Sequence, residues 1–327
     1  MLVSIIIPMY GVEPVLPQCL DCLLGQTYKH LEIIFVDDCS PDRSSQLVSK
    51  RQGELEEQGY RVKLIKHQQN GGVAMARNTG IDAAEGEYIY YFDADDRLEP
   101  DAIDLMVGEA RRTDADIVGI DWSLSYEGKE RRMHQPLVTQ GIEAFRYMCY
   151  GSFKWNLWLF LVRRELYERG GRKRFLPGQN MGEDMMLMGK LFLKARHVTI
   201  LPQVLYHYVK TNADSLTANY TDKHWGQVDA NLQELEQYVL ANRVDDGVRC
   251  IALLKLNLKL PLLISPRQSD YDRWAGWFTE ANPYIMSNPV LPLRTRLLQK
   301  VAAHGQWWLV RLYYELIMRV LYSIFYK

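Results

Sequence analysis

The sequence predicts an α/β fold in which helices flank a mostly parallel sheet. Over about the first 120 residues, short apolar runs typical of strands alternate with amphipathic stretches typical of helices. Strands and helices that alternate at this spacing form right-handed βαβ units. The runs are apolar throughout, as expected for strands buried on both faces of a parallel sheet. Two of the first four runs end in aspartates, which a purely structural sheet does not need.

The expected strands are rich in β-branched, aliphatic or aromatic residues. They are Leu2–Ile7, Leu31–Val36, Val62–Ile65, Tyr88–Phe92 and Asp116–Ile120. We expect Pro8 to end the first strand, because proline cannot donate a ladder hydrogen bond.

The expected helices lie between these strands. The first carries leucines at helical spacing and ends at Gly25, and the second runs to about Gln58. Asn70-Gly71-Gly72 is a turn before a helix over Val73–Ala84. Pro100 opens the next helix, which runs to about Arg112.

The fourth strand delivers carboxylates at its C-terminal end, in Asp93-Ala-Asp-Asp96. Ligands of open α/β sheets bind at that end of the strands. Asp93 and Asp95 share one face if the strand persists, and paired hard oxygens suit Mg²⁺ or Mn²⁺ with substrate phosphates. The alternative is an acidic turn containing Asp95 and Asp96. From these residues alone, both interpretations stay open.

Composition excludes several classes of protein. Lys and Arg (39) nearly balance Asp and Glu (40), so no basic field points to a nucleic-acid partner. Five cysteines are too few for a disulfide scaffold and favour a reducing, cytoplasmic location. We expect no signal peptide and no membrane-spanning helix, because no uncharged apolar stretch reaches 18 residues.

From about Thr221 the pattern becomes helical, so we expect a catalytic domain over residues 1–220 and a helical extension over 221–327. The last segment, Trp307–Lys327, is rich in aromatic residues and places Arg311, Glu315 and Arg319 on one helical face. It suits a helix packed on the protein's own core. It equally suits a helix that lies in a membrane interface.

Several motifs in the first 217 residues together resemble family 2 glycosyltransferases. They are Val3–Tyr10, Gln26-Thr27, Glu32–Ser40, Asn70–Asn78 with Gly80, Gly86–Asp96, Gly182–Asp184, Tyr206–Tyr208 and Ser215–Thr217. The resemblance implies the GT-A nucleotide-diphospho-sugar transferase fold, a Rossmann-like, mostly parallel sheet with flanking helices, here followed by a helical C-terminal region.

The same resemblance implies inverting transfer of a sugar from a nucleoside-diphosphate donor, expected to be a UDP-sugar. The acceptor would be a glycan or a lipid-linked glycan in surface polysaccharide synthesis. Peripheral membrane contact through the C-terminal helix and a homodimer are further expectations about partners.

The resemblance also assigns the donor-binding residues. Pro8 and Tyr10 would line the base pocket, and Asp38 would accept from a base N–H. Arg77 would lie near the base or phosphate, and Asp93 would serve the ribose.

Two further acids have roles in the reaction itself. Asp95 would bind the Mn²⁺ or Mg²⁺ on the diphosphate, and Asp184 would be the general base that deprotonates the acceptor hydroxyl. Inversion needs one base opposite the leaving group, whereas a retaining double displacement would need a nucleophilic carboxylate, for which Glu183 is the obvious spare. Without the resemblance, Glu183 and Asp184 are better explained as acids at a helix N-terminus, where they interact well with the helix dipole.

The sequence departs from the family pattern at Cys39, at Leu159-Phe160 after Trp158, and at Val209-Lys210. These differences put polar acceptor contacts and a phosphate clamp in doubt. His207 is either a metal ligand or a packed or surface histidine.

Two other functions remain alternatives. A sugar nucleotidyltransferase should carry a Gly-rich basic loop after the first strand, where this chain has Pro8-Met9-Tyr10-Gly11. A non-catalytic nucleotide-sugar scaffold is favoured less, because Asp95 and Asp184 are both present.

Overall fold

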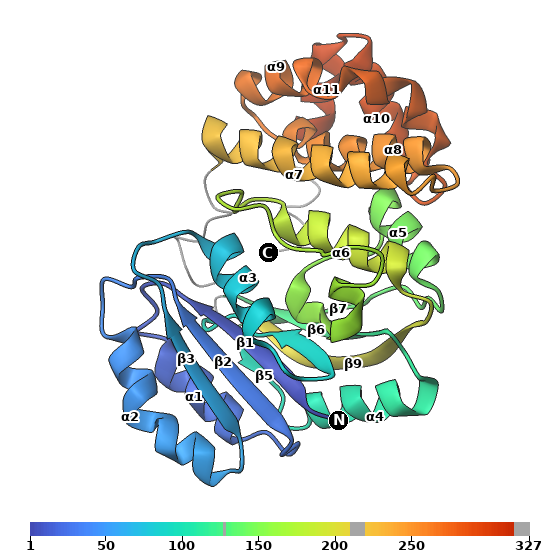
Figure 1. Cartoon of the computed structure of the whole chain (residues 1–327). Helices are drawn as coiled ribbons and strands as arrows, with labels where there is room; N and C mark the ends of the chain where they lie inside the picture. Colours follow the sequence, from blue (N-terminus) through green and yellow to red (C-terminus); the bar gives the residue numbers. More distant parts are fainter. Residues whose placement is uncertain (127–128, 210–219, 317–327) are drawn as a thin grey trace. The chain divides into compact units, whose positions relative to one another are not determined.

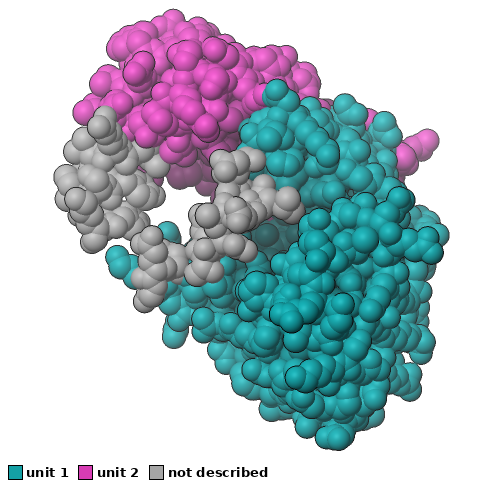
Figure 2. Space-filling view, turned by 90° about the vertical axis from the view of Figure 1, so that its left-hand side faces the viewer, with its two compact units in different colours: residues 1–145, 154–237 teal, residues 146–153, 238–327 magenta. Residues whose placement is uncertain are grey.

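The computed structural model describes residues 1–126, 129–209 and 220–316. These form two compact units, coloured separately in Figure 2. Unit 1 comprises residues 1–145 and 154–237, and unit 2 comprises residues 146–153 and 238–327. The boundary at residue 237 falls inside helix α7 (Asp222–Ala241). The division at residue 220 stays a prediction.

The described part of unit 1 contains one nine-stranded sheet, in the order β3-β2-β1-β4-β8-β6-β9-β5, with β7 paired to β6. The strands are β1 (Val3–Met9), β2 (Leu31–Asp37), β3 (Arg61–Lys66), β4 (Tyr88–Tyr91), β5 (Arg97–Leu98), β6 (Ile117–Tyr126), β7 (Lys129–Met133), β8 (Phe160–Arg163) and β9 (Val198–Val209).

The predicted α/β fold is confirmed, and its parallel part is β3-β2-β1-β4, as the alternating pattern indicated. The other half of the sheet is mixed. Strand β8 pairs antiparallel with both β4 and β6, whereas β9 runs parallel to β6. The buried central strands, β1 and β2, form the core of this sheet, as their unbroken apolar runs predict.

The expectation that Pro8 ends the first strand is wrong, since β1 continues to Met9. Ile6 accepts a hydrogen bond from the N–H of Phe92, and Pro8, two residues on, faces the same side. The last register pair between β1 and β4 is Ile6 with Tyr91. The missing N–H of Pro8 therefore points past the end of the neighbouring ladder and breaks no hydrogen bond in it.

Helices cover both faces of the sheet. In Figure 1, α3 (Val73–Ala83) lies on one face, whereas α1 (Leu16–Leu24) and α4 (Ala102–Thr113) lie on the other. The remaining helices of the region are α2 (Ser44–Glu57) and α6 (Glu183–Lys194), with short 3₁₀ turns η1 (Leu157–Leu159) and η2 (Arg164–Tyr167). Helix α5 (Gly141–Tyr150) reaches the unit boundary. All four helices predicted before residue 120 are present.

Unit 2 is helical, as expected from the C-terminal pattern. Its described elements after α7 are α8 (Gly247–Lys259), η3 (Leu260–Leu263), α9 (Gln268–Gly276), η4 (Thr279–Ser287), α10 (Leu293–Ala303) and α11 (Trp307–Tyr313). Pro283 lies inside η4 and does not interrupt it. Among the described helices, none is long and apolar enough to cross a membrane.

The beginning of α11 packs on unit 2 itself. The ring of Trp307 stacks on Tyr271 with centroids 5.7 Å apart, and it meets Trp274 edge-on at 6.1 Å. Val310 is fully buried. The core-packing interpretation thus accounts for one face of this helix, while Arg319 and the rest of residues 317–327 lie outside the described residues.

Candidate active site

The parallel register brings the predicted donor residues to one edge of the sheet. Met9 pairs with Asp37, and Ile6 pairs with Tyr91, so the ends of β1, β2 and β4 are neighbours. Pro8 lies near the end of β1, and exposed Tyr10 follows that strand. Asp38 follows β2, and Asp93 follows β4. This is the edge at which open α/β sheets bind ligands.

Asp38 is almost completely buried and is held by three donors. Its Oδ1 accepts from the N–H of Gly71 at 2.9 Å and lies 2.7 Å from Nδ1 of His67. Its Oδ2 accepts from the N–H of Gly72 at 2.7 Å. The carboxylate therefore fixes the turn before α3. The sequence offered no signal for the partnership with His67.

The turn before α3 needs glycine at position 72. Its φ is +84°, and a Cβ there would lie 2.1 Å from Nδ2 of Asn180. The Oδ1 of Asn180 accepts from the N–H of Ala74, in the first turn of α3, at 3.1 Å. Asn180 was not among the predicted residues, and only the fold brings it to this helix.

Arg77 is buried among three carboxylates. Its Nη1 lies 2.8 Å from Oε1 of Glu183 and 2.8 Å from Oδ1 of Asp184, and its Nη2 lies 3.4 Å from Oδ1 of Asp93. The side chain crosses from α3 to the start of α6 and to the end of β4. The structure shows Arg77 paired with acidic side chains, and its predicted contact with a base or phosphate stays a prediction.

Burial and charge act in opposite directions on these carboxyls. Burial raises the pKa of Asp184, the positive charge of Arg77 lowers it and Asp93 raises it, with a net increase. The pKa of Glu183 is also raised, first by burial and then by the charge of Asp184. The pKa of Arg77 is raised despite its burial, because Asp184 and Asp93 stabilise its charged form. Asp184 is thus a carboxylate of increased basicity with a fixed counter-charge.

The segment from Asp93 to Asp96 is a turn, because β4 ends at Tyr91 and the N–H of Asp96 donates to the carbonyl of Asp93 at 3.2 Å. Asp95 is exposed, whereas Asp96 is buried. Asp96 accepts from the hydroxyl of Tyr206 at 2.7 Å and from the N–H of Val209 at 2.8 Å. It therefore ties the turn to β9 and leaves Asp93 and Asp95 for other partners.

The acids of this turn fit a divalent cation. The pKa of Asp95 is raised by desolvation and then by the negative charge of Asp93, so a bound cation would relieve repulsion. Within the described residues, no three His, Cys, Asp or Glu side chains are grouped to hold a metal by themselves. One or two carboxylates completed by substrate phosphates and water are the usual protein contribution to Mg²⁺ binding.

His207 is engaged elsewhere. Its Nε2 lies 2.6 Å from Oε1 of Glu99, and its Nδ1 lies 2.7 Å from Oε1 of Glu130 and 2.8 Å from the hydroxyl of Ser123. With both ring nitrogens taken, the packed-histidine interpretation describes this structure.

Aromatic side chains stack beside the turn. The ring of Trp158 lies 4.4 Å from that of Tyr206 and 5.8 Å from that of Tyr208, nearly parallel to both. Leu159 and Phe160, where the family carries polar residues, are fully buried and cannot contact an acceptor with polar groups. Lys210 and Ser215–Thr217 lie outside the described residues.

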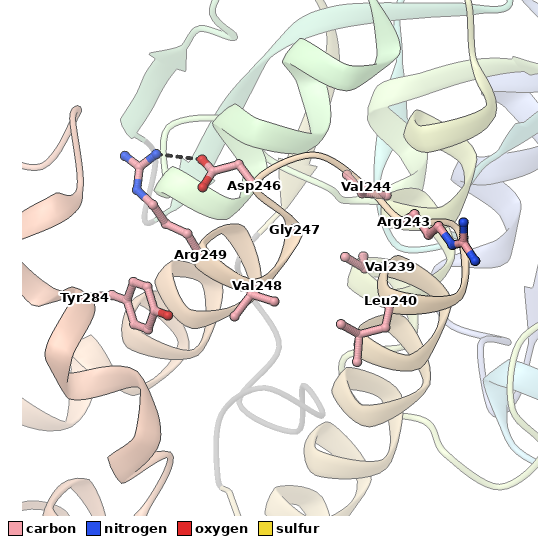
Figure 3. Close-up of a pocket in the computed structure, with 9 residues that line it drawn as sticks. All are labelled: Val239, Leu240, Arg243, Val244, Asp246, Gly247, Val248, Arg249 and Tyr284. Atoms are coloured by element: carbon pink, nitrogen blue, oxygen red, sulfur yellow. Dashed lines mark hydrogen bonds and ion pairs between the residues drawn. The ribbon is translucent and has the colours of Figure 1, made fainter.

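A pocket of about 380 Å³ lies wholly within unit 2, between the end of α7 and the start of α8 (Figure 3). Its lining mixes exposed Leu240 and Val248 with the 2.6 Å ion pair of Arg249 and Asp246. No residue predicted for the site lines it.

Comparisons with known proteins agree with the motifs. The family model described as glycosyl transferase family 2 matches residues 4–174. The uncharacterized glycosyltransferase EpsJ of Bacillus subtilis is 36% identical over 225 residues, which are 66% of this chain and 63% of EpsJ. Glycosyltransferase GlyG of Streptococcus pneumoniae is 27% identical over 73% of this chain and 81% of GlyG. The chain thus spans less than two thirds of the length of EpsJ.

Solved structures share the fold. S. aureus TarS 1-349 in complex with UDP-GlcNAc has a TM-score of 0.72 at 18% identity, covering 96% of this chain and 92% of that one. The mannosyltransferase PcManGT of Pyrobaculum calidifontis, in complex with GDP-Man and Mn²⁺, has a TM-score of 0.51 at 19% identity, with coverage of 96% and 83%. These likenesses establish the GT-A type of sheet and helices.

Proposed function

The chain belongs to glycosyl transferase family 2, and from that membership we propose that it transfers a sugar, with inversion, from a nucleoside-diphosphate donor to a hydroxyl group of a glycan or lipid-linked acceptor. The expected donor is a UDP-sugar, and the expected process is surface polysaccharide synthesis. The observation that carries the proposal is the ion pair between Arg77 and Asp184 beside the Asp93–Asp96 turn.

Asp184 is the proposed general base. It lies in the first turn of α6, far in sequence from the donor-side acids, yet Arg77 links it to Asp93. A single base opposite the leaving group is what a one-step inverting displacement requires. The raised pKa of Asp184 makes its carboxylate a stronger acceptor of the hydroxyl proton than an ordinary aspartate. Arg77 holds this carboxylate in place and offsets its charge.

The donor side is assigned to the other predicted residues. Tyr10, which is exposed, and Pro8 are assigned to the base pocket, and the buried carboxylate of Asp38 would accept from a base N–H. Asp93, which pairs with Arg77, would bind the ribose. A Mn²⁺ or Mg²⁺ ion held by Asp95 would act as a Lewis acid that stabilises the departing diphosphate. The structure of PcManGT contains GDP-Man and Mn²⁺, and a structure of TarS contains UDP-GlcNAc. By analogy, these structures support the proposed metal and donor.

The alternatives have less support. A nucleotidyltransferase needs cations on the loop after the first strand, and Met9–Gly11 offers none. A non-catalytic scaffold would have no use for a buried Arg77 that pairs with two adjacent acids at the start of α6, because removing such charges altogether is often stabilising.

The exposed face of the C-terminal helix suits a membrane surface. Trp308 and Leu312, one turn apart on α11, are 65% and 46% exposed, and Leu316 is 53% exposed. Arg311 lies beside them, and Arg294 and Lys300 are exposed on α10, which packs against α11. Apolar side chains flanked by cations are typical of helices that lie on anionic lipid. We therefore propose that this face contacts a bilayer near a lipid-linked acceptor.

A donor screen tests the proposed activity. UDP-, GDP- and dTDP-sugars are incubated with the protein and Mn²⁺, and nucleotide release is followed alongside thermal stabilisation. We expect one donor class to stabilise the protein and to be hydrolysed slowly even without an acceptor. If no sugar nucleotide binds or is consumed, the proposed function is wrong.

A further inference from the structure

His67 joins Asp38 to helix α3. It follows β3 directly, and its Nδ1 lies 2.7 Å from Oδ1 of Asp38. Its Nε2 lies 2.9 Å from the hydroxyl Oγ1 of Thr79, on α3. The Asp38 side chain is 4% exposed and that of His67 17%. The three side chains thus form a hydrogen-bonded chain at the carboxyl edge of the sheet.

Proton positions in this chain follow from the groups themselves. An ionised carboxylate can only accept, so Nδ1 of His67 must carry the hydrogen toward Asp38. In the neutral ring Nε2 is then an acceptor, and the hydroxyl of Thr79 donates to it. Thr79 therefore selects the tautomer that Asp38 needs.

Asp38 has one acceptor position that no described residue occupies. A carboxylate offers about four lone-pair positions, two on each oxygen. Oδ1 uses both of its positions, for the N–H of Gly71 and for His67. Oδ2 uses one, for the N–H of Gly72. Among the described residues no other group donates to this carboxylate, so one position, on Oδ2, is open.

A single open acceptor position discriminates between nucleobases. Uracil and thymine present one ring N–H, flanked by two carbonyl acceptors. Guanine presents a ring N–H and an adjacent amino group together, which is best matched by both oxygens of one carboxylate. Occupation of Oδ1 by His67 leaves guanine with one unpaired donor against a buried group, which is costly.

We propose that His67 is the positioning residue that restricts Asp38 to one open acceptor and thereby selects a uracil- or thymine-type donor over a guanine-type donor. This inference rests on the proposed function, because it assumes that Asp38 reads the donor base. It adds the residue that would enforce the preference for a uracil- or thymine-type base.

The test measures binding of UDP and of GDP to the full chain by calorimetry with Mn²⁺ present. For the wild type we expect UDP to bind at least about fivefold more tightly, the minimum for one unpaired hydrogen-bonding group. His67→Phe removes the hydrogen-bond donor to Asp38 and should weaken UDP binding at least about tenfold. It should also reduce the ratio of UDP affinity to GDP affinity. His67→Asn keeps an N–H near the position of Nδ1. It should restore most of the UDP affinity and most of the preference for UDP over GDP.

Controls separate positioning from general damage. His197→Asn changes an exposed histidine of the same unit and should leave both affinities unchanged. Thr79→Val leaves His67 in place but removes the hydroxyl that sets its tautomer, so it should reduce the UDP preference even if His67→Phe does not fold. In turnover, the KM for the donor should rise in His67→Phe and Thr79→Val while kcat changes little.

Opposite outcomes overturn specific claims. Equal wild-type affinities for UDP and GDP, or an unchanged preference in both His67→Phe and Thr79→Val, would refute the inference while leaving the proposed function standing. A wild type that binds neither nucleotide would refute both.

Discussion

Arg77 and Asp184 are 107 positions apart in sequence, yet Nη1 of the arginine lies 2.8 Å from Oδ1 of the aspartate, and both side chains are largely shielded from water. The same nitrogen contacts Glu183, and the other terminal nitrogen reaches Asp93. Helix α3, helix α6 and the end of β4 are thus joined through one guanidinium. The proposed catalytic base and the proposed donor site share a counter-ion.

Removing that counter-ion should be costly. In Arg77→Met, three carboxylates lose their shared cation, and truncation of one partner of a buried ion pair typically costs about 3–5 kcal/mol. We expect a matching loss of unfolding free energy in denaturant titrations and a large loss of turnover. Arg77→Lys keeps the charge but not the planar fork of the guanidinium. Its stability and turnover should lie between those of wild type and Arg77→Met. A variant Arg77→Met with wild-type stability would show that the cluster carries little energy.

Glu183 should give the protein a pH-dependent stability. Its pKa is raised above the usual 4.5, by burial and then by Asp184, so the folded state binds its proton more tightly than the unfolded state. Stability from this group is therefore lost as pH rises above about 4.5 toward the raised pKa. Glutamine has the same shape as Glu183 but does not ionise, so Glu183→Gln removes this pH-dependent loss of stability. Relative to wild type, the melting temperature of Glu183→Gln should increase as pH rises from 5 to about 9.

Glu57 is a matched control for that series, because it is an exposed glutamate on α2. Glu57→Gln should track the wild type at every pH. Parallel curves of melting temperature against pH for Glu183→Gln and wild type would contradict a raised pKa for Glu183.

Asp95 should control metal-dependent donor binding. Asp95→Ala removes the exposed carboxylate of the turn, so calorimetric UDP binding in Mn²⁺ should fall to the level measured in EDTA. Asp101→Ala, an exposed acid at the start of α4 without a side-chain capping bond, should behave as wild type. If Asp95→Ala retains Mn²⁺-dependent UDP binding, residues other than Asp95 bind the metal.

The exposed face of α11 should bind anionic lipid. Trp308→Ser with Leu312→Ser should abolish flotation with vesicles of phosphatidylglycerol and phosphatidylcholine, while Leu240→Ser, an exposed apolar residue on α7, should not. Binding by wild type should weaken with salt, because Arg311 and its neighbours contribute electrostatically. If wild type does not bind these vesicles but elutes as a dimer that is stable to salt, the exposed face of α11 contacts a second copy of the chain instead.

Much of the fold follows from periodicity. The apolar runs of β1 to β4 and the leucine spacing of α1 are local signals, so their types and order were predictable. Strand β5 has two residues and gives no pattern. Strand β9 contains Pro202 and a shift in its register with β6, both of which interrupt the alternation expected of a strand.

The candidate site was predictable only in part. Asp38, Asp93 and Asp95 stand at strand ends, where the carboxyl edge of a parallel sheet gathers them. The position of Arg77 among acids was not predictable, because nothing local in α3 indicates that the start of α6 packs against it. The same holds for Asp96 with Tyr206, which are 110 positions apart, and for His67, which has no motif around it.

The most direct test of the account is the turnover of Asp184→Asn with the donor identified by the screen. The substitution keeps the shape of the side chain and removes its basicity, so donor affinity measured by calorimetry should stay near that of wild type. The rate should fall by about 10²- to 10⁴-fold, the usual contribution of a general base. An Asp184→Asn variant that binds donor normally and turns over at the wild-type rate would contradict the central assignment.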